Sequence, residues 1–325
     1  MAVIEISVVV PVYGSEPTLP LLWSRLSGVL KNCSATYEVI FVDDGSRDGS
    51  WQQLKVLQSE NPDCVIAIQL MRNFGQHNAL MAGFHHVRGQ VVITIDDDLQ
   101  HPPEEIPRLL EILRDEDLDV VYGTYDTKKH ASWRNAGSIL AVWFFRSIFR
   151  VSVTPTAFRA MRREVVECIL PYDKNFTIID GLLAWSTQRI GEIKVQHHPR
   201  AEGQSGYSIR KLLLQSMNVL TNFSLAPLQL VSAVGILTSL AGLSLAAYYL
   251  VLYFSSRVGV PGYASLMVTL LVASGLQLLS LGIIGEYIGR VLLNINQKPQ
   301  FVQRTVLSAS TPALSELRTN VRSSG

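Results

Sequence analysis

Three consecutive carboxylates, Asp96, Asp97 and Asp98, follow an apolar segment that has the character of a buried strand. Neighbouring carboxylates repel one another and resist burial, so a positive charge is expected close to them. Carboxylates at a strand end can bind a hard divalent cation, and the cation can neutralise a diphosphate. Because alternate residues of an extended segment point the same way, we expect Asp96 and Asp98 to form the metal-binding pair and Asp97 to face elsewhere.

A structural role for the same acidic segment stays open, because acidic residues also cap helices. Pro102 and Pro103 favour the start of a helix directly after the three aspartates. Capping and metal binding can coexist in one segment.

Two other strand ends carry polar clusters, Pro11–Tyr13 and Asp43–Ser46. Ligands of parallel sheets bind beyond the carboxyl ends of the strands, so we expect all three clusters in one crevice. Asp43 or Asp44 can accept the imide N–H of a pyrimidine or the N–H groups of a guanine; the alternative is an ordinary turn followed by a helix cap. Neither the glycine motif of dinucleotide-binding domains nor that of P-loops occurs, which disfavours a dehydrogenase or an ATPase.

The elements that must position these clusters alternate along the N-terminal half of the chain. Near-continuous Val/Ile runs separated by helical crossovers predict an α/β domain with a largely parallel sheet covered on both faces. The expected strands are 6–13, 37–44, 65–70, 91–96 and 119–124, and the expected helices are 19–30, 51–59, 79–87 and 104–114.

The C-terminal half has a different character. Residues 228–254 and 263–285 contain no charged side chain. Each segment is longer than the about 20 apolar residues that span a bilayer, which predicts a transmembrane hairpin. Basic residues flank the hairpin, so the positive-inside rule places the catalytic half and both termini in the cytoplasm. The alternative is a buried helical hairpin in a soluble protein. Residues 138–150 and 208–226 are amphipathic; they are expected either on the membrane surface or as ordinary packing helices.

A basic segment with hydroxyl groups precedes the hairpin and suits a lipid phosphate at the membrane interface. Plain juxtamembrane positive charge is the alternative. The candidate phosphate-binding residues are Arg200, Ser205, Tyr207, Arg210 and Lys211.

Composition excludes some classes of protein. With 28 basic and 27 acidic residues the chain is nearly neutral, which gives no electrostatic reason to expect nucleic acid as a partner. Cys33, Cys64 and Cys168 are far apart and are expected to be reduced. A secretory signal is not expected, because no basic region followed by an apolar core opens the sequence. We expect a catalytic domain at 1–207, an amphipathic helix at 208–226, the hairpin at 227–290 and a cytosolic tail at 291–325 with a disordered end.

Seven motifs carry a resemblance to a known family. They are, in order, VVVPVYGSEPTLP, VIFVDDGSRDGS, RNFGQHNALMAGF, IDDDLQHPPEEIP, FRAMRREVV, HHPRAEGQSGYSIRKL and GEYIGR. With these motifs the chain resembles the polyprenyl-phosphate glycosyltransferases of glycosyltransferase family 2, among them two-span bactoprenol glucosyl transferases, undecaprenyl-phosphate aminoarabinose transferases and dolichol-phosphate mannose synthase-like enzymes. The similarity runs from about residue 6 to 304.

The resemblance implies a GT-A fold and the inverting transfer of a sugar from a nucleotide diphosphate sugar to a membrane polyprenyl phosphate. Asp96 and Asp98 match the metal-binding acidic motif, which implies Mg²⁺ or Mn²⁺, with Asp98 also counted as catalytic. The nucleotide-sugar pocket of the family is matched by Pro11, Tyr13, Asp43, Asp44, Asp96 and Asp97. The loop associated with the acceptor phosphate is matched by Arg200 and Ser205. Relatives often form homotetramers.

The sequence departs from the family pattern at two places. Relatives often have Asn-Glu where this chain has Gly14-Ser15, and many carry acidic residues just before the FR motif, where this chain has none. The second difference leaves no general base there, and Asp180, in a context similar to the base motif of the wider family, is the candidate instead. A phosphate acceptor has a second pKa near ~6, so it needs positioning more than proton removal.

The sequence thus predicts an enzyme of the bacterial inner membrane that makes a lipid-linked sugar for cell-envelope glycan or lipopolysaccharide modification. The donor is expected to be a UDP-sugar, and a flippase and a periplasmic transferase are potential downstream partners. A processive polysaccharide synthase would need more spans and a Q-x-x-R-W segment. A catalytically silent nucleotide-sugar-binding scaffold is the non-enzyme alternative, against which the retained Asp96 and Asp98 count. A sugar nucleotidyltransferase would need no hairpin.

Overall fold

The computed structural model of the chain describes residues 4–33, 36–125, 153–174, 177–196, 226–255, 262–295 and 299–309. The chain divides into two compact units, one formed by residues 1–206 with 299–325 and the other by residues 207–298. The segments expected to be amphipathic, 138–150 and 208–226, lie outside the described residues except for Ala226.

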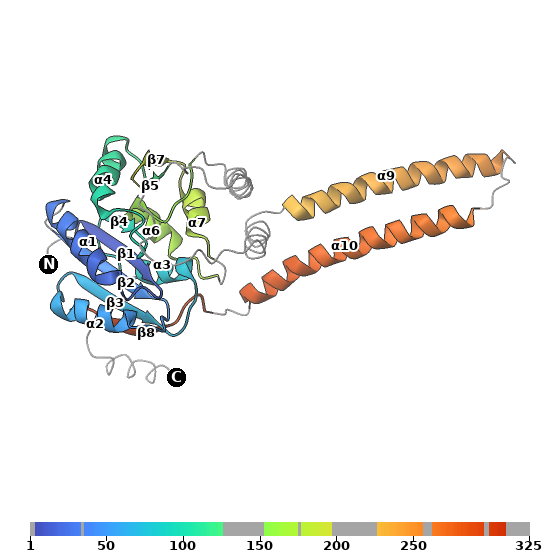
Figure 1. Cartoon of the computed structure of the whole chain (residues 1–325). Helices are drawn as coiled ribbons and strands as arrows, with labels where there is room; N and C mark the ends of the chain where they lie inside the picture. The colour runs from blue at the N-terminus through green and yellow to red at the C-terminus, as the bar shows by residue number, and fades with distance from the viewer. Residues whose placement is uncertain are drawn as a thin grey trace, which may run out of the picture. The chain divides into compact units, whose positions relative to one another are not determined.

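The first unit is built on one eight-stranded mixed sheet with the strand order β7-β5-β6-β4-β1-β2-β3-β8 (Figure 1). Its centre consists of parallel pairs, β4–β1, β1–β2 and β2–β3, and β5–β7 is also parallel. β6 and β8 run antiparallel to their neighbours. The strands are β1 (Ile6–Val12), β2 (Tyr37–Asp43), β3 (Val65–Leu70), β4 (Val91–Thr94), β5 (Val120–Thr124), β6 (Arg159–Arg162), β7 (Ile190–Lys194) and β8 (Gln303–Leu307).

Helices cover both faces of this sheet, as the sequence predicts (Figure 1). On one face, Leu19, Leu22, Leu26 and Leu30 of α1 recur at helical spacing and pack into the main core. On the other face α3 lies so close to β1 that a Cβ on Gly83 would stand 2.4 Å from Val9 Cγ1. The helices are α1 (Leu19–Cys33), α2 (Ser50–Glu60), α3 (Gln76–Phe84), the 3-10 turn η1 (Pro103–Glu105), α4 (Ile106–Asp115), α6 (Arg163–Ile169) and α7 (Ile179–Ser186).

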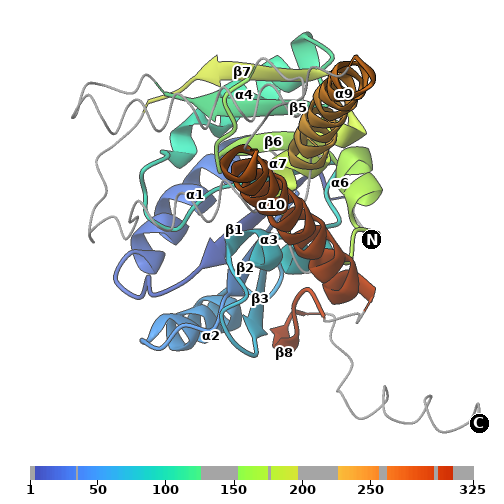
Figure 2. The same cartoon turned by 90° about the vertical axis from the view of Figure 1, so that its right-hand side faces the viewer.

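The segment after the hairpin differs from the tail expected at 291–325. Strand β8 pairs with β3 and closes one edge of the sheet, where Figure 2 shows the two strands side by side. Met71 N donates to Val302 O at 2.9 Å, and Gln300 Nε2 donates to Thr177 Oγ1 at 2.5 Å. Residues 299–307 therefore belong to the first unit, although more than two hundred residues separate β8 from β3.

The second unit contains two long antiparallel helices, α9 (Ala226–Phe254) and α10 (Tyr263–Ile295) (Figure 1). They include both expected spans, 228–254 and 263–285, and α10 continues beyond residue 290. Within the described residues, Val272–Gly289 is long and apolar enough to cross a membrane, and Val231–Gly242 is a shorter apolar helical stretch. Large apolar side chains are exposed along both helices, for example Leu237 and Leu278.

Candidate active site

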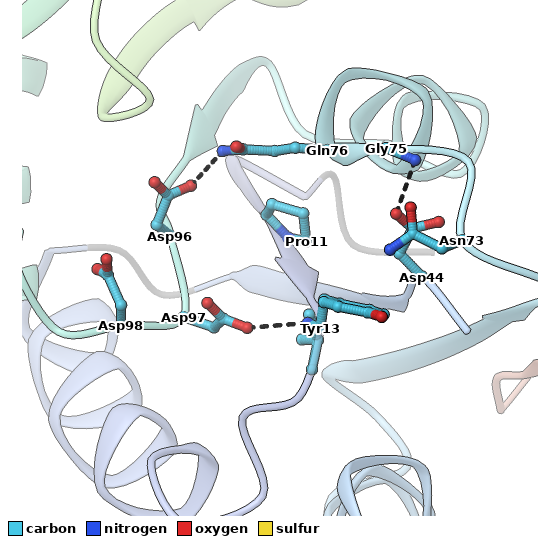
Figure 3. Close-up of a pocket in the computed structure, with 10 residues that line it drawn as sticks. Pro11, Tyr13, Asp44, Asn73, Gly75, Gln76, Asp96, Asp97 and Asp98 are labelled. Carbon is cyan, nitrogen blue, oxygen red and sulfur yellow. Dashed lines mark hydrogen bonds between the residues drawn. The ribbon is translucent and has the colours of Figure 1, made fainter. Parts of the chain in front are cut away.

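A pocket of about 260 Å³ opens beyond the carboxyl ends of β1, β2 and β4 (Figure 3). The structure brings together there the polar residues from all three strand ends, as the sequence predicts. In Figure 3 the carboxylates of Asp96 and Asp98 lie on one side of the pocket, and Asp44 lies on the other. The pocket is lined by Pro11, Val12, Tyr13, Asp44, Asn73, Gly75, Gln76, Asp96, Asp97 and Asp98.

Asp44 directly follows β2 and is held by the loop between β3 and α3. Its Oδ1 accepts a hydrogen bond from Phe74 N at 2.7 Å, and its Oδ2 accepts one from Gly75 N at 2.8 Å. Burial raises the pKa of Asp44 to about 6, although these two amides partly oppose the shift. The carboxylate is thus fixed in place and titrates close to neutral pH.

Asp97 faces the loop after β1, away from the pair formed by its neighbours. Its Oδ2 accepts hydrogen bonds from Tyr13 N at 3.1 Å and from the Ser15 hydroxyl. Burial raises the pKa of Asp97, and both hydrogen bonds oppose that shift. Ser15, at one of the positions where the chain departs from the family pattern, therefore helps to fix the backbone of Tyr13. The Tyr13 side chain itself is 55% exposed and free to contact a ligand.

Asp96 and Asp98 have the donor chemistry of a hard-cation site. Asp96 Oδ1 accepts a hydrogen bond from Gln76 Nε2 at 2.6 Å, and Asp98 Oδ1 accepts one from Gln100 N at 3.1 Å. No group of three or more His, Cys, Asp or Glu side chains that could hold a metal occurs among the described residues. Two carboxylates in an open pocket fit a Mg²⁺-like ion, which takes one or two protein carboxylates and completes its shell with substrate phosphates and water.

The capping alternative for the acidic segment finds no support at the following helix. Neither η1 nor α4 has a side-chain hydrogen bond at its N-cap. Asp98 instead closes a local turn with Gln100.

Two expected site residues, Asp43 and Asp180, do not line the pocket, and a further group cannot be compared with it. Asp43 Oδ1 accepts from Ser46 N at 3.0 Å, and its buried Oδ2 has no hydrogen-bond partner among the described residues. Asp180 lies in the first turn of α7, where it pairs with Arg159 and accepts a hydrogen bond from Tyr122 Oη at 3.0 Å. The expected acceptor-binding residues, Arg200, Ser205, Tyr207, Arg210 and Lys211, lie outside the described residues.

The sequence analysis did not single out Asn73, Gly75 and Gln76, which also line the pocket. The signal was present, because a polar segment follows β3 just as polar segments follow β1, β2 and β4. The expected helix at 79–87 instead begins at Gln76, after Gly75 with φ +92°. That earlier start brings Gln76 to the pocket.

Comparison with known proteins places the chain in a family. The sequence model described as Glycosyl transferase family 2 matches residues 7–170, and the one described as GtrB C-terminal hairpin matches residues 226–291. The chain therefore belongs to glycosyltransferase family 2, and it is a glycosyltransferase with a GT-A-like mixed α/β domain.

Curated relatives match almost the whole chain. The undecaprenyl-phosphate 4-deoxy-4-formamido-L-arabinose transferase of Serratia proteamaculans is 37% identical over 308 residues, which cover 93% of this chain and 94% of that protein. An uncharacterized glycosyltransferase of Synechocystis is 37% identical over 304 residues, 92% of this chain and 94% of that protein.

Among solved structures, glucosyl-3-phosphoglycerate synthase from Mycobacterium tuberculosis, in complex with Mn²⁺, UDP and phosphoglyceric acid, is 19% identical. The structural match covers 67% of this chain and 76% of the synthase chain, with a TM-score of 0.48.

Proposed function

We propose that this glycosyltransferase moves a sugar from a nucleotide diphosphate sugar, a UDP-sugar by preference, to undecaprenyl phosphate. The observation that carries the proposal is one pocket that presents the Asp96–Asp98 carboxylates and Asp44 together. Support for the acceptor comes from the relatives named undecaprenyl-phosphate 4-deoxy-4-formamido-L-arabinose transferase, which are similar over nearly the full length.

The nucleoside would occupy the side of the pocket formed by Pro11, Tyr13 and Asp44. Each Asp44 oxygen accepts one backbone N–H and keeps a second lone pair for the N–H of a base. The exposed ring of Tyr13 offers an aromatic face for stacking, while Asp97 holds its backbone.

The diphosphate would lie beside Asp96 and Asp98, which would hold Mg²⁺ or Mn²⁺. When bound, such an ion supplies positive charge for the diphosphate that leaves. Gln76, which donates to Asp96, fixes the orientation of that carboxylate before any ligand arrives.

The chemistry needs little proton transfer. An oxygen of the acceptor phosphate forms a bond to the anomeric carbon as the bond from that carbon to the diphosphate oxygen breaks, and attack from the opposite face inverts the configuration. The acceptor phosphate has its second pKa near ~6, so it is mostly dianionic at neutral pH. The protein therefore contributes mainly by alignment and by the electrostatics of the site.

The hairpin would anchor the enzyme in the membrane that holds the acceptor. Contiguous exposed apolar surface, such as that along α9 and α10, is unfavourable in water and typical of a buried or membrane-embedded face. By the positive-inside rule, its basic flanks favour an orientation in which the catalytic unit and both termini would face the cytoplasm, at the inner membrane of a bacterium. Arg200, Ser205, Tyr207, Arg210 and Lys211 remain the candidates for binding the acceptor phosphate there.

Assembly and pathway are further parts of the proposal. By resemblance to relatives the enzyme would form a homotetramer. Its product would then pass to a flippase and a periplasmic transferase that modify lipopolysaccharide or another cell-envelope glycan.

An organic-phase transfer assay tests the function directly. Purified full-length protein is incubated with undecaprenyl phosphate, Mg²⁺ or Mn²⁺ and radiolabelled nucleotide sugars, and the label extracted into organic solvent is counted. We expect label from one donor, lost with EDTA and in Asp98→Asn but kept in Asp115→Asn, a matched change on the exposed end of α4. Equal label with Asp98→Asn, or none from any donor by protein that binds UDP, would contradict the proposal; the latter would favour the silent scaffold.

A further inference from the structure

A buried charge lies beside the strand that carries the acidic segment. Arg159, the first residue of β6, is 1% exposed, and in the sheet it is paired with Thr94, the last residue of β4. Its Nε donates to Thr94 Oγ1 at 3.0 Å, and Thr94 Oγ1 donates to Ala157 O at 2.6 Å. The guanidinium is thus fastened to the end of β4, two residues before Asp96.

Asp180 provides the negative charge that this buried guanidinium requires. It forms an ion pair with Arg159 and accepts from Tyr122 Oη at 3.0 Å through the same oxygen, Oδ1. Burial by itself would lower the pKa of Arg159, but Asp180, Tyr122 and, more weakly, Asp96 raise it overall. An unpaired buried charge is strongly unfavourable, so Arg159 and Asp180 depend on each other.

The first turn of α3 links the same cluster to Asp96 by a second route. Gln76 donates to Asp96, and the next residue, His77, accepts from Ile179 N through Nδ1 at 3.5 Å. Ile179 begins α7 and directly precedes Asp180. The start of α7 therefore contacts both supports of Asp96, the end of β4 through Arg159 and the start of α3 through His77.

We propose that the Arg159–Asp180 pair positions Asp96 for metal binding, and that Asp180 acts through Arg159 instead of accepting a proton from the acceptor. The inference rests on the proposed function for the identity of the site. Its geometry is independent of the substrate, because Asp180 does not line the pocket and its Oδ1 already serves two donors. Arg159 and Asp180 are accordingly positioning residues.

The first test measures metal binding without catalysis. Mn²⁺ is titrated into full-length protein with UDP and without acceptor, and free Mn²⁺ is followed by electron paramagnetic resonance. In Arg159→Lys and Asp180→Asn the Kd for Mn²⁺ is expected to rise about 10- to 100-fold, the range found when groups that support metal ligands are changed. Arg163→Lys and Asp173→Asn, matched changes at exposed ion pairs, are expected to leave the Kd unchanged.

The second test separates positioning from proton transfer. At saturating Mn²⁺, Asp180→Asn is expected to recover most of its kcat and to keep the pH profile of the wild type. A kcat that stays about 1000-fold down at saturating metal, with loss of the limb that reports a deprotonated base, would overturn the proposal. A Kd for Mn²⁺ equal to that of the control variants would overturn it as well.

A third variant covers the case in which loss of a charge prevents folding. Thr94→Val keeps both charges and nearly the same volume. It removes the oxygen that accepts from Arg159 Nε and donates to Ala157 O. We expect a raised Kd for Mn²⁺ with kcat retained at saturating metal, and an unchanged Kd would contradict the proposal. Because Mn²⁺ binding is read directly, failure of the wild type to transfer sugar would refute the proposed function without deciding this inference.

Discussion

A buried carboxylate lies at each end of β2, and the two carboxylates differ in how their negative charge is compensated. Near the start of β2, Glu38 is fully buried and meets Arg88, whose Nε and backbone N both donate to it at 2.7 Å. Just past the end of the strand, Asp44 accepts hydrogen bonds only from backbone amides, and no ion pair to it occurs among the described residues. Arg88 thus neutralises Glu38 within the protein, whereas the negative charge of Asp44 is not neutralised by a described cation.

This difference separates stability from function. Ser7 Oγ also donates to Glu38 at 2.6 Å, so the first end is a closed network of charge and hydrogen bonds. At the pocket end Asp44 and Asp97 have raised pKa values, because burial is opposed only by neutral donors. Carboxylates held in this way favour the arrival of a cation and of N–H groups, which is the role that the proposed function gives them.

The largest expected effect is the loss of a carboxylate at the pocket end. Asp96→Asn is expected to lower the initial rate of sugar transfer about 1000-fold or more, because several kcal/mol of charge stabilisation depend on the metal that this residue would hold. EDTA should have an equal effect on the wild type, reversed by Mg²⁺ or Mn²⁺. A rate within tenfold of wild type for Asp96→Asn would break the comparison.

The next effect is a pH dependence of donor binding. With a pKa of about 6, Asp44 becomes neutral below that pH and can no longer offer two accepting oxygens, so the Kd for an intact nucleotide sugar should rise about 10-fold per pH unit below 6. Calorimetry between pH 4.5 and 8, without acceptor, measures this. Asp44→Asn is expected to bind weakly and without this pH dependence; a slope that persists in the variant would assign the titration to another group.

The sign of the Asp44 shift also bears on stability. The folded pKa of about 6 lies above the ordinary value of 3.8, so the free energy of unfolding falls as the pH rises from about 4 to about 6. Asp44 in its ionised form thus costs stability at neutral pH.

At the neutralised end the expected effect is on stability alone. Glu38→Gln leaves Arg88 without its counter-charge, and the partly exposed guanidinium can turn to solvent, so the free energy of unfolding should fall by about 2 kcal/mol. Thermal unfolding followed by fluorescence should show a Tm lower by about 5 °C. Glu60→Gln, on the exposed end of α2, is the matched control. A large drop in kcat without a drop in Tm would contradict the division between the two ends.

The smallest effect is expected at Ser15. Ser15→Ala removes one of the two hydrogen bonds that Asp97 Oδ2 accepts from the loop after β1, and it loosens the part of that loop that carries Tyr13. The KM for the donor should therefore rise about fivefold, corresponding to about 1 kcal/mol. Ser24→Ala, on the exposed face of α1, should leave KM unchanged. An unchanged KM in Ser15→Ala would mean that Tyr13 N alone fixes Asp97.

The central strands could be predicted from the sequence because strands that are buried on both faces consist largely of consecutive Val and Ile residues. β3 begins and ends where expected, and β1, β2 and β4 differ by at most two residues. β6, β7 and β8 were not predicted, because these strands are only four or five residues long and contain charged or polar side chains. For β8 the pairing partner is also remote in sequence, so no local pattern could reveal it.

The site was predictable to the extent that strand ends determine it. Asp96, Asp98 and Tyr13 follow from that rule. Asp97 does face away from the pair, but the reason given from the sequence was wrong, because β4 ends at Thr94 and Asp97 and Asp98 lie in a turn and not in an extended segment. The choice between Asp43 and Asp44 depends on the turn at Gly45, with φ +71°, whose backbone conformation the sequence does not specify. The partnership of Asp180 with Arg159 joins two segments that share no local motif, so only the fold reveals it.

The central claim is that the pocket end of the sheet carries the donor-binding chemistry, and UDP-binding calorimetry with and without Mn²⁺ tests it most directly. The account predicts Mn²⁺-dependent binding by the wild type and by Glu38→Gln, and loss of that dependence in Asp98→Asn. Equal binding of UDP by Asp98→Asn, or binding by the wild type that is indifferent to Mn²⁺, would contradict it.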